Sequence, residues 1–98
     1  MKEELKQIIE YYGVIPQLKY FQSEVFELNE AIFEHYYDEY KFENDTVLKK
    51  HITEEIADVL VMLKQFQYYY RIEDKEIEEV MKFKIERQLE RIKNEVEK

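Results

Sequence analysis

Four carboxylates set in two pairs are the residues of this chain best suited to chemistry. Glu24 and Glu27 stand three residues apart, as do Glu55 and Asp58, and each pair lies in a stretch with helical spacing of apolar residues. Residues three apart share one face of a helix, so each pair forms a two-carboxylate claw. Two claws that face each other would bind a hard divalent cation through oxygen, which favours Mg²⁺, or Mn²⁺, over zinc.

A cation is needed because burying the edges of these carboxylates uncompensated would cost several kcal/mol per ion. Carboxylate-bound Mg²⁺ usually keeps coordination positions for water and substrate phosphates. A nucleoside triphosphate is therefore the expected partner. A single Glu-x-x-Glu pair is more often a solvated helix face, but the two pairs are offset in the same sense from their apolar sectors, which favours a metal site.

The composition predicts one all-α domain spanning residues 1–98. The chain is 45% apolar and 39% charged and has one glycine and one proline, so it lacks the turn-forming residues that connect many strands. No apolar run is long enough for a membrane span and no signal pattern opens the chain, so we expect a cytoplasmic protein. Without cysteine there is no thiolate metal site. A net charge of −8 argues against a nucleic acid polymer as partner.

The pattern predicts four helices, with Gly13 ending the first and Pro16 in the first turn of the second. Asp45 or Thr46 would cap the third, and Glu76 would complete a capping box at the start of the fourth, with Ile72 and Ile77 as a hydrophobic staple. The expected ranges are 2–12, about 16–37, about 46–70 and about 74 to the C-terminus, with 38–46 as a connector.

Each long helix has a predicted apolar sector, and the claws border two of these sectors. For the second helix the sector is Leu18, Phe21, Val25, Leu28 and Ile32; for the third it is Leu48, Ile52, Ile56, Val59, Leu63, Phe66 and Tyr70. Antiparallel packing of the two sectors would turn the claws toward each other. The last helix has the core stripe Ile85, Leu89, Ile92 and Val96.

The last helix also carries a row of cations. Lys84, Arg87 and Arg91 line up beside its apolar stripe and make the C-terminal segment locally basic. They are candidates for binding the phosphates of a nucleotide, with a solvated helix face as the alternative. Phe26 and Phe33 lie opposite the predicted core sector of the second helix, which indicates an interface with another copy of the chain.

A di-iron carboxylate bundle is a competing interpretation of the acids. Such bundles use Glu-x-x-His on two helices. Ile32 stands three residues before His35, and Leu48 three before His51, so the motif is absent. A non-catalytic acidic adaptor that binds a nucleotide or a protein also remains open.

The order of these motifs resembles the MazG-like all-α nucleoside triphosphate pyrophosphohydrolases. The resemblance rests on Tyr-Gly-x-x-x-Gln at 12–17, Ser-Glu-x-x-Glu-Leu-x-x-Ala-Ile at 23–32, Glu-Glu-Ile-Ala-Asp-Val-Leu at 54–60 and Lys-Ile-Glu-Arg-Gln-Leu-Glu-Arg-Ile at 84–92. It covers nearly the whole chain. The family signature is Glu-Glu-x-x-Glu followed by Glu-x-x-Asp, and Ser23 stands where its first glutamate belongs.

The resemblance implies a four-helix bundle completed by dimerisation or tetramerisation. It also implies Mg²⁺ held by Glu24, Glu27, Glu55 and Asp58, and hydrolysis of a nucleoside triphosphate to a monophosphate and pyrophosphate. One glutamate, Glu24 or Glu27, would accept the proton of the attacking water.

Overall fold

The computed structural model describes residues 1–36 and 46–97, which form four α-helices and no strand. The helices are α1 (Lys2–Tyr12), α2 (Val14–Tyr36), α4 (Thr46–Tyr69) and α5 (Asp74–Val96). The all-α class and the four helix positions predicted from the sequence are confirmed. Apart from Thr46, which begins α4, the predicted connector lies outside the described residues.

Gly13 separates α1 from α2, as its position in the sequence predicts. Its φ of +90° is one that residues with a side chain rarely adopt. Its backbone N–H donates to the Ile9 carbonyl at 2.8 Å and its carbonyl accepts from the Gln17 N–H at 3.2 Å, so the two helices join almost without a loop. Ile9, which is fully buried, anchors α1 against the longer helices.

The buried line of α2 is rotated relative to the predicted apolar sector. Gln17, Glu24 and Ala31 are buried, whereas Leu18 and Ile32, at the two ends of that sector, are exposed. These three buried residues are seven apart, which is the repeat of a helix packed lengthwise against a partner. The expectation that Leu18 and Ile32 belong to the core is therefore wrong, and the face that packs carries polar groups.

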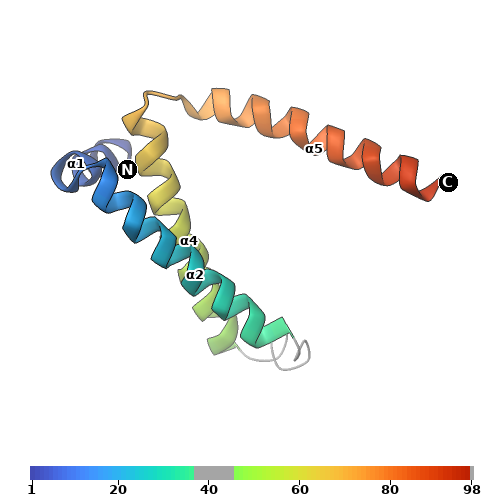
Figure 1. Ribbon diagram of the computed structural model, residues 1–98, viewed down its shortest axis with the longest axis horizontal. Coiled ribbons are helices and arrows are strands. Elements are labelled where there is room, and N and C mark those ends of the chain that lie inside the picture. Colours follow the sequence, from blue (N-terminus) through green and yellow to red (C-terminus); the bar gives the residue numbers. More distant parts are fainter. Residues whose placement is uncertain (37–45, 98) are drawn as a thin grey trace.

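The same rotation occurs on α4, which packs along α2 (Figure 1). Met62 is buried and Glu55 half-buried, while the predicted core residues Ile56, Leu63 and Tyr70 are exposed. A paired helix buries only the narrow line where the backbones approach, and a sector read from hydrophobicity alone is wider than that line.

The end of α4 is built as a Schellman turn. The N–H of Ile72 donates to the Gln67 carbonyl and that of Arg71 to the Tyr68 carbonyl, each at 3.0 Å. Arg71 closes the turn with a φ of +59°, in the left-handed region where glycine is usual. The sequence offers no glycine there, so this reversal could not be predicted from it.

Asp74 fastens the start of α5 to the end of α4. Its carboxylate accepts hydrogen bonds from Gln67 Nε2 at 2.7 Å and Tyr68 Oη at 3.0 Å and pairs with Lys64 Nζ at 2.8 Å. The predicted capping box also forms, because the Glu76 carboxylate accepts the Glu73 backbone N–H at 2.7 Å.

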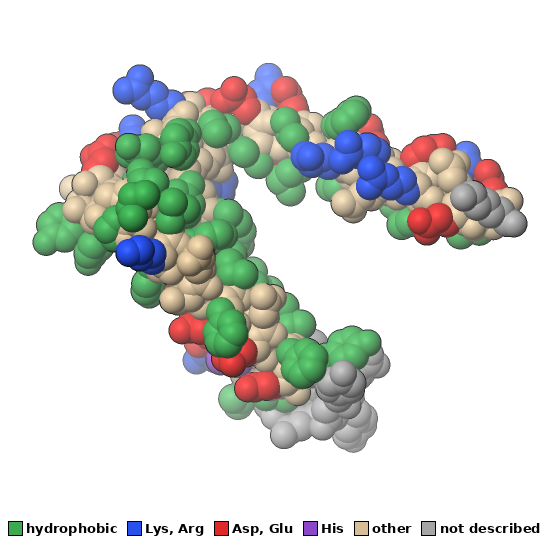
Figure 2. Space-filling view, viewed as in Figure 1, with side chains coloured by type: hydrophobic (Ala, Val, Ile, Leu, Met, Phe, Trp, Pro, Cys, Tyr) green, Lys and Arg blue, Asp and Glu red, His purple; other side chains and the backbone are tan. Residues whose placement is uncertain are grey.

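Beyond this junction α5 projects away from the other three helices (Figure 1). None of its described residues is buried, so the predicted core stripe of this helix is exposed in the single chain. Figure 2 shows apolar and basic side chains exposed along it. The apolar ones include Val80, Met81, Phe83, Ile85, Leu89, Ile92 and Val96, each more than half exposed.

Within the described segments, no helix has the length and apolar character that crossing a membrane requires.

Candidate metal centre and adjoining pocket

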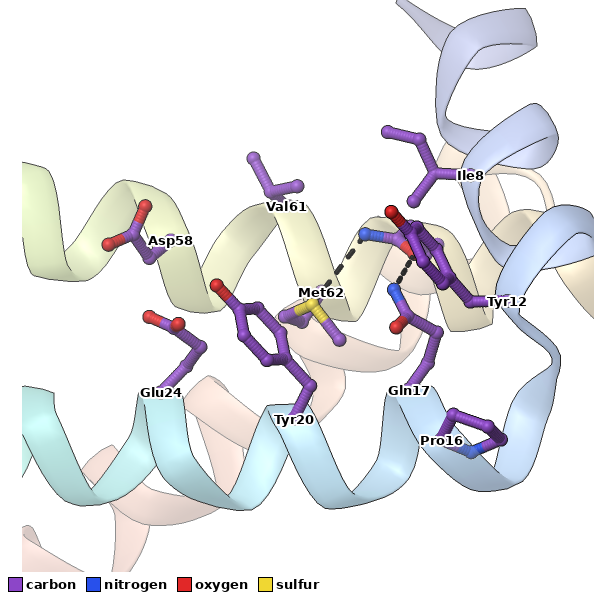
Figure 3. Close-up of a pocket in the computed structure, with 10 residues that line it drawn as sticks. Ile8, Tyr12, Pro16, Gln17, Tyr20, Glu24, Asp58, Val61 and Met62 are labelled. Atoms are coloured by element: carbon purple, nitrogen blue, oxygen red, sulfur yellow. Dashed lines mark hydrogen bonds between the residues drawn. The ribbon is translucent and has the colours of Figure 1, made fainter.

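Packing of α2 on α4 brings together three of the four carboxylates predicted as metal ligands. Glu24 comes from α2, and Glu55 and Asp58 from α4; one oxygen from each lies within 4.8 Å of the others. In Figure 3 Glu24 on α2 and Asp58 on α4 lie opposite each other where the two helices face. Helical spacing puts Glu55 and Asp58 on one face, and the heptad-like contact line turns that face toward Glu24.

The burial of these acids is uneven in a way that suits a cation site. Glu24 retains only 5% of its exposure and Glu55 is half-buried, while Asp58 stays open to solvent. Glu24 Oε2 and Glu55 Oε2 are buried with no hydrogen-bond partner. Buried polar atoms are normally paired, so these two unpartnered carboxylate oxygens are candidates for binding a positive group. The donor set is all oxygen, which fits Mg²⁺ or Mn²⁺.

Electrostatics agree with this geometry. Burial raises the pKa of Glu24; a hydrogen bond from Tyr20 opposes that rise, and the charges of Glu27, Asp58 and Glu55 add to it. The same hydrogen bond to Glu24, followed by the surrounding negative charge, raises the pKa of the Tyr20 phenol. A cation would relieve all of these repulsions together.

The remaining predicted site residues lie elsewhere in the single chain. Glu27 is exposed and outside the group of three, although its charge acts on Glu24. Lys84, Arg87 and Arg91 are exposed on α5, on the part of the helix that projects from the rest. The Arg87 guanidinium lies over the Phe83 ring, 6.0 Å from its centroid.

A pocket of about 530 Å³ adjoins the acids, between α1, α2 and α4. Glu24 and Asp58 line one end of it and Gln17 and Gln65 line the other. Tyr20 lies between the two ends, with its hydroxyl directed toward the acids (Figure 3). This volume is within the range of small-molecule sites.

Sequence reasoning missed the glutamines and Tyr20. A lone glutamine in an amphipathic helix is typical of a surface position, so neither Gln17 nor Gln65 stands out in the sequence as a site residue. The available signal was spacing: Gln17 is seven residues before Glu24, and Gln65 seven after Asp58. Residues two turns from a ligand on a packed helix lie on the same contact line.

Comparison with known proteins finds no family model that matches the chain and no significant match among curated proteins or solved structures. The likeness to MazG-like enzymes therefore rests on the sequence motifs alone.

Proposed function

We propose that this protein is a Mg²⁺-dependent nucleoside triphosphate pyrophosphohydrolase. The observation that carries the proposal is the convergence of Glu24, Glu55 and Asp58 with two buried, unpartnered oxygens beside a pocket of nucleotide size. The motif order that resembles MazG-like enzymes supports it. Bound by these three acids, Mg²⁺ would supply positive charge that neutralises the phosphates of the substrate.

The residues of the chain have separate tasks in this reaction. A water oxygen bonds to phosphorus, the P–O bond between the α and β phosphates breaks, and a monophosphate and pyrophosphate leave. Glu27 accepts the water proton, because it borders the three grouped acids without belonging to them. Glu24 is the second choice: burial raises its pKa, which suits proton transfer, but the same burial suits a metal ligand.

In this proposal the cations that bind the substrate phosphates, Lys84, Arg87 and Arg91, come from a second copy of the chain. A 23-residue helix with its apolar stripe exposed gains little stability alone, since most helical stability in proteins comes from packing. A homodimer or homotetramer would cover that stripe and Phe26 and Phe33, which are 62% and 65% exposed. The cations Lys84, Arg87 and Arg91 lie on the same helix, so packing of α5 against a second copy would bring them to that copy.

Product analysis tests the reaction. With Mg²⁺ and a panel of nucleoside triphosphates we expect monophosphate and pyrophosphate, and no orthophosphate. Glu27→Gln and Asp58→Asn should abolish the rate, while Arg87→Ala should reduce it, because one clamp charge supplies only part of the transition-state stabilisation. Glu30→Gln, an exposed acid of the same helix, is the matched control. Orthophosphate as the sole product, or full activity in both acid variants, would refute the mechanism.

Subunit mixing tests the shared site. Light scattering should give at least twice the 12.3 kDa monomer mass. If the acids and the cations of one site belong to different chains, inactive Asp58→Asn subunits and impaired Arg87→Glu subunits should recover activity when they are mixed. A monomer at micromolar concentration, or no recovery in proven mixed dimers, would contradict the arrangement.

A non-catalytic nucleotide-binding adaptor is the second candidate. Ser23 stands in place of a third acid in the first claw, and Glu27 lies outside the grouped ligands. This candidate predicts Mg²⁺ and nucleotide binding with no pyrophosphate release from any substrate.

A further inference from the structure

The end of the pocket away from the acids contains a buried chain of polar side chains that the proposed hydrolysis does not use. Gln17 Nε2 donates to Gln65 Oε1 at 2.8 Å, and Gln65 Nε2 lies 3.6 Å from Met62 Sδ. Gln65 retains 1% of its exposure and Gln17 7%, yet both line the pocket. A buried amide pair beside an open cavity is a means of recognising a ligand as well as a way to join two helices.

The thioether fixes which amide atoms remain available. Sulfur in Met62 is a weak acceptor and cannot donate, which favours the amide orientation that turns the Gln65 nitrogen toward it. The Gln65 carbonyl oxygen then accepts one of the two N–H donors of Gln17 (Figure 3). The Gln17 carbonyl oxygen is left as the acceptor of this chain, at the wall of the pocket.

Aromatic rings and apolar side chains complete the same end of the pocket. Tyr12 and Ile8 line the pocket beside the glutamines, and the Tyr20 ring and Val61 lie between them and the acids (Figure 3). Flat aromatic surface next to a single amide acceptor matches a nucleobase, which stacks through its face and bonds through its edge. The acids at the opposite end match the phosphates of the same molecule.

We propose that this end of the pocket binds an amino-bearing nucleobase (cytosine, adenine or guanine), whose exocyclic amino group donates a hydrogen bond to the Gln17 carbonyl oxygen. The proposal deepens the proposed function by naming the substrate class, and it rests on that function only for placing the phosphates at the acids. A base with a carbonyl oxygen at that position, such as uracil, would set two acceptors against each other and bind less tightly.

Equilibrium binding tests this directly, with the ligand varied first so that the protein stays intact. Isothermal titration calorimetry of the wild-type chain with Mg²⁺ would compare CMP, UMP and the N4,N4-dimethyl derivative of CMP. We expect CMP to bind about tenfold more tightly than either of the others, as one net hydrogen bond predicts. Titrations with AMP and GMP extend the comparison to the other amino-bearing bases. Equal affinity for CMP and UMP, or no binding of CMP, AMP or GMP, overturns the proposal.

Protein variants then assign the acceptor. Gln17→Met keeps the side-chain length and removes the acceptor. The variant should therefore bind CMP and UMP with about equal affinity. Gln22→Met, on an exposed position of the same helix, should leave the preference unchanged. An undiminished preference in a folded Gln17→Met protein overturns the assignment. Should that variant not fold, Tyr12→Ala replaces it, because Tyr12 is 58% exposed and its loss should weaken CMP binding.

These outcomes separate the two proposals. A base preference without pyrophosphate release from CTP would refute the hydrolase and leave the base site standing. Pyrophosphate release at equal rates from CTP and UTP, with equal affinity for CMP and UMP, would refute the base site and leave the hydrolase standing.

Discussion

Replacing Glu24 by Gln should make the metal-free protein more stable and remove its response to Mg²⁺. Glu24 as a whole residue is 5% exposed, and one of its carboxylate oxygens lies within 4.8 Å of an oxygen of each of two other acids. At that separation two unit charges repel by about 3 kcal/mol at an effective dielectric of about 20. Salt, the exposure of Asp58 and partial protonation of Glu24 reduce this repulsion.

The expected gain is about 1 kcal/mol, because the glutamine still carries a buried oxygen with no partner. For a domain of this size it corresponds to a melting temperature about 4–8 °C higher. In the wild type, Mg²⁺ at a hundredfold excess over its Kd should add about 2.7 kcal/mol to the free energy of unfolding. The variant should lose most of that gain because it lacks one of the three ligands.

Thermal melts in EDTA and in Mg²⁺ measure both effects, with Glu30→Gln as a control for losing a charge elsewhere on α2. The pH dependence gives an independent check. Burial raises the pKa of Glu24 in the folded protein. The protonated Glu24 therefore contributes to folding stability below the ordinary carboxyl pKa, and this contribution is lost as pH rises through the raised pKa. Metal-free wild type should therefore lose stability from about pH 4.5 toward neutrality, and Glu24→Gln less so. A variant that melts below wild type in EDTA, with its Mg²⁺ shift intact, would refute the metal centre.

Two further predictions concern the junction of α4 and α5. Asp74→Asn should lower the melting temperature at pH 7, because hydrogen bonds from Lys64, Gln67 and Tyr68 hold the pKa of Asp74 at about 2. That stability is present above the ordinary pKa of 3.8 and is lost as pH falls through about 2. The melting temperatures of wild type and variant should therefore converge between pH 4 and pH 2. Glu79→Gln, at an exposed position of α5, is the control. Arg71→Gly should raise stability by about 0.5–1 kcal/mol, since glycine adopts a φ of +59° without strain, whereas Arg71→Ala should not; equal melts of the two variants would contradict this.

The sequence alone determined the helices and the pairing of the acids. Helical spacing fixes which residues share a face, and Gly13 and the Glu73–Glu76 capping box act through neighbours in the chain, so these features needed no tertiary information. Glu24, Glu55 and Asp58 could be predicted to converge because the two claws have equivalent offsets on helices expected to pack.

Tertiary structure decided which line of each helix is buried and what lies beside the acids. Packing buried Gln17, Glu24 and Gln65 in place of the more apolar Leu18 and Leu63, because close approach of two backbones selects a narrow line and polar residues on it can satisfy one another. Only the folded chain could show that α5, whose stripe reads as core, packs on no other described helix beyond its first turn. Hydrophobic spacing states that a face must be covered, and it does not state whether the same chain covers it.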